Sequence, residues 1–330
     1  MEIAVCISGG VDSFYALKWA VENFENVVAV HLNFLNDKSK LKDVKKVIEL
    51  INVPLKIYDC EKIFREKIIN YFVEEYLKGR TPNPCIFCNA FFKFEYVLSK
   101  GYEKVITGHY AKIVKKNTNY FISRGKDLKK EQSYFLARIK QEFLPHIILP
   151  LGEKKKEEII KEVKNFYFKN ESQEVCFIPE NDYKKFIENY CKLKPKKGKI
   201  LNSKGKLIGF HNGFYYFTIG QRKGLNISMG KPYYVIKIDP EKNLVYAGPI
   251  EETYNKKFSI SNQIWYDDPK KFGELMVKVR YRSEAKKCFL NENLEEVILI
   301  EKERAVTPGQ IAVFYFNNLV IGSGIIESAE

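Results

Sequence analysis

The sequence predicts an α/β fold: a doubly wound parallel sheet, with a β-barrel at the C-terminal end of the chain. Over roughly the first hundred residues, short apolar runs alternate with amphipathic helical segments, which is typical of a parallel sheet covered on both faces. From Phe258 onward, short strand-like runs follow one another between turns, which indicates an antiparallel barrel. The length of 330 residues favours two or three domains.

The first residues of the chain contain an anion-binding pattern. Ile3–Ile7 is a short apolar run suited to a buried parallel strand. Gly9 and Gly10 permit a tight turn, and Asp12 or Ser13 is predicted to cap the helix that follows. Backbone N–H groups and the positive end of the helix dipole converge at such a turn, so it suits a phosphate group.

The turn has the sequence of one known type of phosphate loop. It has neither the Gly-Lys-Ser/Thr of a Walker A loop nor the G-x-G-x-x-G of a dinucleotide fingerprint. Ser8–Ser13 instead resembles the pyrophosphate loop (PP-loop) of N-type ATP pyrophosphatases, which cleave ATP to AMP and pyrophosphate. An ordinary strand-to-helix turn is the alternative, but the position directly after a buried strand favours the nucleotide loop.

Further strands and helices complete the predicted sheet domain. The expected elements are strands at Val27–Leu32, Leu55–Tyr58 and Lys104–Thr107, and helices at Leu41–Ile51 and about Lys62–Lys78. Ligands of doubly wound sheets bind outside the carboxyl ends of the strands. The glycine turn, Leu32 and Thr107–His109 fall at such ends, so we expect them to line one nucleotide pocket.

A Cys-x-x-Cys pair, Cys85 and Cys88, follows a proline-rich loop that begins at Gly79. A helix is expected from this pair to about Lys100, and a thiol at a helix N-terminus has a lowered pKa. Half of a structural zinc site is the alternative, although the sequence holds no second Cys-x-x-Cys pair. A further cysteine, Cys176, stands much later in the chain.

The region after the sheet strands is expected to hold a hairpin and several helices. Tyr110–Val114 and Tyr120–Arg124 predict a hairpin inserted in the sheet domain. Lys130–Gln132, taken alone, indicates only a solvated helix start. The helix predicted at Lys154–Asn165 has an outward charged face, which we interpret as solvation. Another helix is expected from about Asp182 to Cys191.

Two later segments have the composition of RNA-binding surfaces. The basic turn Lys192–Lys199 precedes the aromatic stretch Gly209–Leu225, whose Gly-Gln-Arg-Lys-Gly loop suits phosphate contact beside stacked bases. In Val277–Arg282 the cations occupy every second position, about 6.7 Å apart on a strand, which is close to the spacing of successive phosphates. The alternatives are an aromatic strand at Phe214–Phe217 and a merely solvated strand face.

Charge and cysteine content bound the partners and the compartment. The formal net charge of +14 attracts polyanions, usually nucleic acid, although lysine enrichment from base composition or growth temperature gives the same excess. Seven cysteines without a regular framework indicate a reducing compartment, and we expect the cytoplasm. No apolar run has the length of a membrane span and no signal-peptide pattern opens the chain, so no membrane partner is expected.

Together these motifs resemble, in order and spacing over nearly the whole chain, the tRNA-specific 2-thiouridylases (the MnmA/TrmU family of the PP-loop superfamily). The matching segments are Ser8–Ser13, Gly79–Asn89 with Lys93 and Phe94, Thr107–Ala111, Lys130–Leu136, Ser172–Ile178, Tyr216–Leu225, Val279–Arg282, Ala305–Gln310 and Gly322–Glu327. The resemblance implies a PP-loop catalytic domain at residues 1–178, a small central tRNA-contacting domain at 179–252 and a tRNA-binding C-terminal β-barrel at 253–330.

The resemblance also implies a reaction with its cofactors and partners. ATP, with Mg²⁺, would adenylate the C2 oxygen of the wobble uridine of a tRNA, because a ring carbonyl oxygen cannot leave unaided. Sulfur would then attack C2 and displace AMP, which gives 2-thiouridine. The sulfur donor would be a persulfide carrier of a cysteine desulfurase system, or sulfide.

Individual roles carry over from the matching motifs. Cys176 is implied to carry the incoming persulfide and Cys88 to attack its inner sulfur, so that the two end as a disulfide. The implied ATP-binding residues are Ser8, Gly9, Gly10, Val11, Asp12, Ser13, Leu32 and Gly108. The implied tRNA-binding residues are Asn83, Pro84, Cys85, Lys130, Glu131, Gln132, Gln221, Arg222, Lys223, Arg280 and Tyr281, the first three facing the flipped base.

The chain departs from the family at Cys85. Many members carry an aspartate there, to which acid/base work is assigned; a thiol is a poorer proton shuttle and a better ligand for soft metals. Cys85, Cys88 and Cys176 would supply three ligands of a [4Fe-4S] cluster whose open iron delivers sulfide. Persulfide transfer and cluster-dependent transfer both stay open, and the loss of the aspartate slightly favours the cluster.

Two other classes of function compete with thiolation. Another PP-loop enzyme, such as an amidotransferase-type synthetase or a lysidine-forming ligase acting on tRNA, would not need the three cysteines. A non-catalytic RNA-binding zinc protein would bind zinc stoichiometrically and would not exchange pyrophosphate with ATP.

Overall fold

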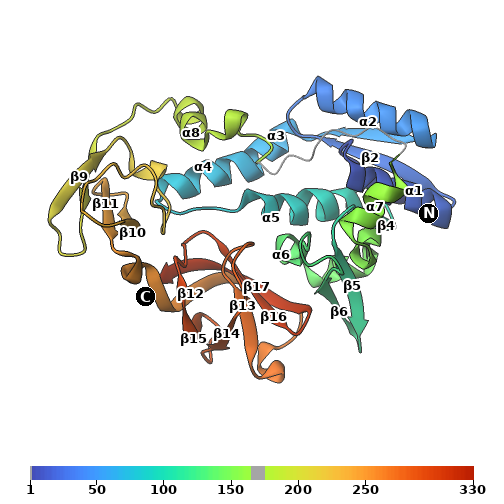
Figure 1. The fold of residues 1–330 in the computed structure, drawn as a ribbon. Helices are drawn as coiled ribbons and strands as arrows, with labels where there is room; N and C mark the ends of the chain where they lie inside the picture. Colours follow the sequence, from blue (N-terminus) through green and yellow to red (C-terminus); the bar gives the residue numbers. More distant parts are fainter. Residues whose placement is uncertain (1, 165–174) are drawn as a thin grey trace.

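The computed structural model describes residues 2–164 and 175–330 of the chain (Figure 1). A parallel sheet with its helices comes first, a small four-stranded sheet lies at the opposite end of the molecule, and a β-barrel packs beside the helices between them. This is the predicted α/β architecture with a C-terminal barrel, and it contains the small central domain that the family resemblance implied.

The parallel sheet has the strand order β3-β2-β1-β4-β7. Its strands are β1 (Ile3–Cys6), β2 (Val27–Asn33), β3 (Leu55–Asp59), β4 (Lys104–Ile106) and β7 (Ile147–Ile148). Helices α1 (Val11–Asn23) and α2 (Lys38–Ile51) connect the first three strands. The predictions for these strands and helices are confirmed, except that the two-residue strand β7 was not foreseen.

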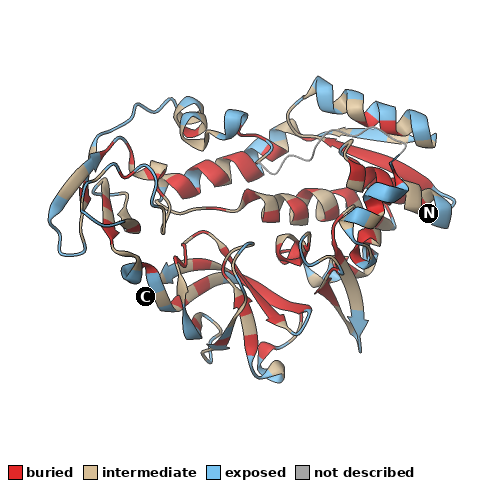
Figure 2. Ribbon diagram, in the orientation of Figure 1, coloured by how far each residue is buried: buried red, intermediate tan, exposed pale blue. Residues whose placement is uncertain are grey.

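Both faces of this sheet are buried. In β2, Val28 and Val30 belong to one hydrophobic core, whereas Val27 and Ala29 belong to the other. Successive side chains of a strand point to opposite faces, so helices must cover both sides, as double winding requires. Figure 2 shows the resulting buried band through the sheet and its helices.

Two long helical segments, each made of α-helical and π-helical parts, run across the middle of the molecule (Figure 1). The predicted long helix forms as α3 (Glu61–Phe64), a π-helical turn (Arg65–Ile69) and α4 (Asn70–Leu77). After the proline-rich loop, α5 (Pro84–Cys88) continues into a second π-helical turn (Asn89–Tyr96). Such turns are frequent at functional sites. Among the residues that the structure describes, no helix has both the length and the apolar character needed to cross a bilayer.

The central part consists of α8 (Tyr183–Cys191) and a four-stranded sheet. The strand order is β10-β11-β8-β9, with β8 (Gly198–Leu201), β9 (Leu207–His211), β10 (Tyr234–Asp239) and β11 (Leu244–Gly248). An aromatic strand at 214–217 is not present: Phe214–Tyr216 forms a 3₁₀ turn. The turn is favoured because the Tyr215 hydroxyl donates to Glu188 on α8 at 3.2 Å, which draws the aromatic side chains toward that helix.

The C-terminal part is a closed six-stranded barrel. Its strands are β12 (Tyr254–Trp265), β13 (Leu275–Lys278), β14 (Lys286–Leu290), β15 (Glu296–Arg304), β16 (Ile311–Phe316) and β17 (Leu319–Ala329). They pair in the order β12-β15-β14-β13-β16-β17, and β12 also pairs with β17, which closes the barrel. The barrel prediction is confirmed.

The predicted hairpin forms as β5 (Ala111–Lys116) and β6 (Asn119–Arg124), inserted in the chain between β4 and β7 of the sheet domain as expected. Its pairing was not foreseen: β6 pairs with β17 and so extends the barrel sheet. The Arg124 guanidinium lies 4.5 Å from the centre of the Tyr315 ring on β16, and this cation–π contact helps to hold the hairpin there.

The predicted strand at 277–282 is also wrong beyond Lys278, where β13 ends. Arg280 begins a turn instead: its carbonyl accepts a hydrogen bond from the Ser283 amide, and its own amide donates to the Ser283 hydroxyl, both at 3.2 Å. The cations of this segment therefore do not form a row along one strand face.

The segment Gly79–Thr81 joins the three parts of the chain. The Thr81 amide donates to Pro308 O at 2.9 Å and its hydroxyl to Thr218 Oγ1 at 3.0 Å, so it contacts both barrel and central domain. Arg80 donates to Glu75 Oε2 at 2.5 Å and also pairs with Glu327 on β17. The loop that leads to the cysteine pair is thus fixed at its start.

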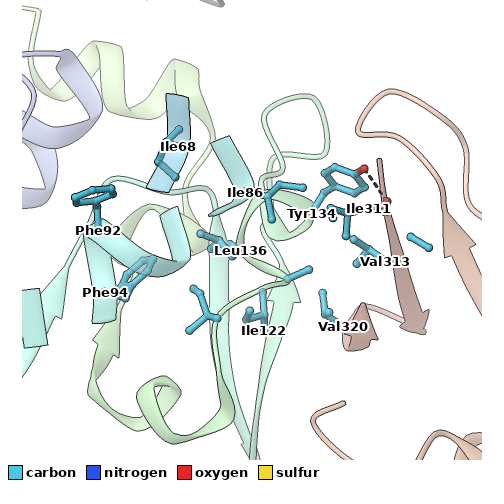
Figure 3. Packing of buried hydrophobic residues seen from close by; sticks show 14 of the residues in the cluster. Ile68, Ile86, Phe92, Phe94, Ile122, Tyr134, Leu136, Ile311, Val313 and Val320 are labelled. Atoms are coloured by element: carbon cyan, nitrogen blue, oxygen red, sulfur yellow. Dashed lines mark hydrogen bonds between the residues drawn. The ribbon is translucent and has the colours of Figure 1, made fainter. Parts of the chain in front are cut away.

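A shared apolar core continues this junction (Figure 3). Ile86 on α5 belongs to the same hydrophobic cluster as Leu136 on α6 (Ser133–Leu136) and Val313 in the barrel. The Tyr134 hydroxyl donates to Ile311 O at 2.8 Å across the same boundary. The parallel-sheet part and the barrel therefore share one hydrophobic core.

Replacing Arg80 by alanine should destabilise the protein by about 2 kcal/mol, because the buried Glu75 loses a charged hydrogen bond and keeps only the exposed Lys78, 3.4 Å away, as an ion-pair partner. The matched control is Arg65→Ala, which breaks an exposed i,i+4 pair with Glu61 and should cost less than about 0.5 kcal/mol. Urea unfolding of the two variants measures the difference. Equal, small losses would contradict a structural role of the junction.

Candidate active site

The PP-loop-like turn, Leu32 and Gly108 lie together at the carboxyl ends of β1, β2 and β4. We call this end of the parallel sheet the nucleotide edge. Strand β1 pairs in parallel with β2 and β4, and the turn leaves β1 at the level where Leu32 lies near the end of β2 and Gly108 follows β4. The structure thus brings together the segments that were predicted to line a nucleotide pocket.

Backbone geometry and one serine shape the turn. Gly9 has a φ of +82°, and a Cβ there would lie 2.9 Å from the Asp43 Cβ, so the position requires glycine. The Ser13 hydroxyl donates to Gly10 O at 2.9 Å. Gly10 is the residue that precedes α1, and no described side chain caps the helix, so the prediction that Asp12 or Ser13 caps it is wrong. The N-terminal end of α1 keeps the positive character that suits an anion.

Asp12 lies at the centre of a charged cluster instead of capping its helix. Its Oδ1 accepts from the Tyr110 hydroxyl at 2.7 Å and from Lys156 Nζ at 2.8 Å. Gly108 lies directly against the Asp12 backbone, since a Cβ at Gly108 would come within 2.6 Å of Asp12 O. A carboxylate and an ammonium group therefore stand together beside the turn, which is the pair of charges needed to hold Mg²⁺ and phosphate.

Lys156 is the site residue that sequence reasoning missed. It is the first residue of α7 (Lys156–Glu162), and its amide donates to Asp127 Oδ2 at 2.9 Å. Its side chain is only 12% exposed, although the helix was interpreted as merely solvated. The sequence contained no signal that separates it from the neighbouring Lys154 and Lys155, because only the tertiary fold aims it at Asp12.

The three cysteines predicted to act together are neighbours. Cys85 and Cys88 lie on α5, and the charge of Cys176 raises the pKa values of both, after the larger effect of burial. All three are free thiols, with Cys176 exposed and the other two partly buried. The arrangement brings an accessible thiol beside two sheltered ones.

The expectation of a lowered thiol pKa is wrong. Burial raises the pKa of Cys85 to about 11 and raises that of Cys88 further, while Lys93 acts in the opposite direction on both. Loss of hydration also raises the pKa of Cys176, against the charges of Lys40 and Lys93. Cys85 lies in the first turn of α5, but there the desolvation of the thiol outweighs the helix dipole.

Lys93 connects the thiols with the nucleotide edge. Its Nζ lies 3.5 Å from His109 Nε2, and its carbonyl accepts from the Cys6 thiol, at the end of β1, at 3.6 Å. Burial lowers the pKa of His109 well below its usual value, so the ring is neutral and Nε2 can accept from the ammonium group. His109 Nδ1 in turn lies 2.8 Å from Thr107 Oγ1. Lys93 is thereby held where its charge reaches all three cysteines.

The donor chemistry of the cysteines suits a soft metal centre, although the three thiols do not surround the position of one metal ion. Three thiolates are the ligands that an iron–sulfur cluster prefers. Within residues 2–164 and 175–330, however, no group of three or more His, Cys, Asp or Glu side chains is gathered around one metal position. The thiols are therefore neighbours without being a ready-made metal centre.

Two of the residues predicted to meet tRNA near Lys130 form hydrogen bonds within the protein. Gln132 is committed to the fold, since its amide donates to Tyr110 O at 2.9 Å and its Oε1 accepts from the Tyr110 amide at 3.0 Å. Glu131 is buried, and its carboxylate accepts from the Ser133 amide at 2.5 Å. Both Glu131 and Lys130 act electrostatically on Tyr281, so the two predicted tRNA segments do lie together.

The remaining predicted tRNA contacts are partly engaged in the fold. Arg280 donates to Arg304 O at 2.6 Å and lies 3.8 Å from the Glu303 carboxylate. Gln221 Nε2 donates to Lys223 O at 2.8 Å and thus shapes its own loop. Arg222 and Lys223 are exposed, and Asn83 and Pro84 form the start of α5.

Comparisons with known proteins agree along the whole chain. Residues 1–180 match the family described as tRNA methyl transferase HUP domain, 184–249 the tRNA methyl transferase PRC-barrel domain, and 255–326 the aminomethyltransferase beta-barrel domain. The chain is 39% identical to the protein named tRNA-specific 2-thiouridylase MnmA 2 of Clostridium botulinum strain Hall, over 98% of each chain. It is 36% identical to tRNA-specific 2-thiouridylase MnmA of Carboxydothermus hydrogenoformans, over 99% of this chain and 97% of that one.

The raised pKa values predict slow alkylation of the sheltered thiols. With a pKa of about 11, Cys85 should react with iodoacetamide at pH 7.5 roughly 100-fold more slowly than an ordinary cysteine, because only the thiolate is nucleophilic. Lys93→Met should slow Cys85 and Cys88 further, since it removes the charge that lowers their pKa values. Lys100→Met is the control, because Lys100 follows the same helical segment but does not act on the pKa of Cys85 or Cys88. Site-resolved mass spectrometry between pH 7 and 10 measures the rates, and a midpoint below pH 8.5 would contradict the assignment.

Proposed function

The chain belongs to the tRNA-specific 2-thiouridylase family, and we propose that it replaces the C2 oxygen of the wobble uridine of a tRNA by sulfur, at the expense of ATP. The observation that carries the proposal is the position of Lys93. Its charge acts on all three cysteines, its Nζ lies 3.5 Å from His109 Nε2, and its carbonyl accepts from the Cys6 thiol. Sulfur chemistry and phosphate chemistry are thus supported at one place.

The nucleotide half of the reaction uses the PP-loop turn. ATP and Mg²⁺ bind at Ser8–Ser13, with Leu32 and Gly108 lining the nucleotide, Asp12 holding the metal and Lys156 contacting the phosphates. The C2 oxygen of the uridine attacks the α-phosphorus and pyrophosphate leaves, so that the oxygen becomes part of an AMP leaving group. The charge pair between Asp12 and Lys156, at 2.8 Å, supports this division of roles.

The sulfur half uses Cys176 and Cys88. The exposed Cys176 receives a sulfur atom from a persulfide donor protein, and the Cys88 thiolate attacks the inner sulfur of that persulfide. The terminal sulfur leaves as sulfide and attacks C2, AMP departs, and Cys88 and Cys176 remain as a disulfide that an external thiol must reduce. The charge of Lys93 favours the Cys88 thiolate against its burial.

The neighbourhood of three thiols also supports a second route. Cys85, Cys88 and Cys176 would be the residues that hold a [4Fe-4S] cluster, which would supply an open iron for binding sulfide. We place the persulfide route first, because the exposed Cys176 is accessible to a donor protein and its charge acts on the more sheltered Cys88. In that route Cys85, protonated at neutral pH, faces the flipped base together with Asn83 and Pro84.

The tRNA is proposed to lie along several surfaces of the protein, and the compartment is proposed to be the cytoplasm. The proposed contacts are Lys130–Gln132 and Arg280–Tyr281 near the nucleotide edge, and Gln221–Lys223 on the central domain. We divide the chain at residues 178/179 and 252/253 into catalytic, central and barrel domains.

Lys156→Gln should lower tRNA-dependent pyrophosphate release from ATP by roughly 100-fold, as expected for the loss of one charged contact to the transferred group. Asp12→Ala should have a similar effect, and both variants should keep their tRNA affinity. Lys155→Gln changes the exposed neighbour and should leave the rate unaltered. Normal turnover by Lys156→Gln, measured with labelled ATP, would remove Lys156 from the nucleotide site.

Replacements of the cysteines separate the two sulfur routes. With iron-free protein and a persulfide donor, Cys88→Ser and Cys176→Ser should form no 2-thiouridine, whereas Cys85→Asp should stay active because a carboxylate restores a proton-transfer group. Cys191→Ser, at a cysteine outside the site, is the control. Mass spectrometry of tRNA nucleosides gives the readout. An inactive Cys85→Asp beside an active, brown, iron-loaded parent would establish the cluster route instead.

A further inference from the structure

The central domain contains a long segment with only positive charges. Residues 189–238 contain ten lysines and one arginine but no aspartate or glutamate. Each of these cations is exposed, and none of them forms an ion pair with an acidic residue in the described parts of the chain. The cations are Lys192, Lys194, Lys196, Lys197, Lys199, Lys204, Lys206, Arg222, Lys223, Lys231 and Lys237. Exposed cations without neighbouring acidic residues suit contact with a polyanion.

An aromatic ring lies exposed within this basic surface. Phe210 lies on β9, an edge strand of the central sheet, and is 52% exposed. Lys197 Nζ lies 4.7 Å from the centre of the ring, and Lys199 is the residue opposite Phe210 in the β8–β9 ladder. Proteins that bind single-stranded nucleic acid combine an aromatic platform for a base with cations for the adjoining phosphates.

A second exposed phenylalanine shows that this combination is local. Phe289 on the barrel is 51% exposed, almost the same as Phe210. The lysines beside it are neutralised, because Lys286 pairs with Glu301 at 2.9 Å and Lys287 pairs with Glu274 at 3.0 Å. Exposure of a ring therefore does not by itself distinguish the central domain; the unpaired positive charge around Phe210 does.

We propose that Phe210 is a stacking platform for an unpaired base of the tRNA, with Lys197 and Lys199 contacting the adjoining phosphates. The inference rests on the proposed function, which makes tRNA the polyanion. Strand β9 lies at the end of the molecule opposite α1 and the nucleotide edge (Figure 1). In the proposed function the wobble base lies at the nucleotide edge, far from Phe210. The nucleotide at Phe210 therefore belongs to a part of the tRNA outside the anticodon loop.

The test compares a full-length tRNA transcript with its isolated anticodon stem-loop, both binding to the complete, nucleotide-free protein. Phe210→Ala should weaken binding of the full-length tRNA roughly 5- to 150-fold, the range for losing one stacked base, and should leave stem-loop affinity unchanged. Phe289→Ala is the matched control and should change neither. Lys197→Ala should reduce the slope of log affinity against log salt by about 0.9 for the full-length tRNA only.

Each outcome decides a separate question. If Phe210→Ala binds full-length tRNA as tightly as the parent protein, Phe210 is not a stacking platform. The remaining candidate for a partner of this basic surface is then an acidic protein. Equal losses on both RNAs, with an unaltered melting temperature, would also overturn the proposal, because the base would then lie in the anticodon arm. A parent protein that binds neither RNA and forms no 2-thiouridine would instead refute the proposed function.

Discussion

The structure depends on the buried charges around Arg80. Its guanidinium lies between Glu75 on α4 and Glu327 on β17, and the next residue, Thr81, is hydrogen-bonded to the barrel and to the central domain. A buried carboxylate that loses its charged partner is destabilised, so Arg80 stabilises the contact between α4 and β17. The contacts of Arg80 and Thr81 fix the start of the loop that leads to Cys85 and Cys88, and the cysteine pair is thereby positioned by all three parts of the chain.

Burial of the site has opposing effects on its chemistry. It removes water that would hydrolyse an adenylated intermediate, but it also disfavours the thiolates on which sulfur transfer depends. Lys93 is the compensating charge, and the neutral His109 holds it because burial keeps that ring unprotonated. A fixed ammonium group in a site of low polarity stabilises an anion more than the same group would in water.

The sequence was sufficient for features that depend on local pattern. The alternation of apolar runs and amphipathic helices predicted the parallel sheet, and the Ser8–Ser13 motif predicted the glycine turn between β1 and α1. Features that depend on which distant segments meet were missed. Lys156 looks like its solvated neighbours until the fold aims it at Asp12, and the hairpin gave no sign that it would join the barrel. The thiol pKa values were misjudged because desolvation depends on burial, which a motif does not contain.

The segments proposed to meet tRNA are attached to the nucleotide edge by the same residue that contacts Asp12. Tyr110 donates its hydroxyl to Asp12, and its backbone exchanges two hydrogen bonds with Gln132. Gln132 is adjacent in sequence to Lys130 and Glu131, which act on Tyr281 of the barrel. Because Tyr110 is fully buried, its ring cannot move without disturbing the core around it. Tyr110 thus links the PP-loop-like turn, through its side chain, to the segment proposed to meet tRNA, through its backbone, so a shift of Tyr110 would disturb both.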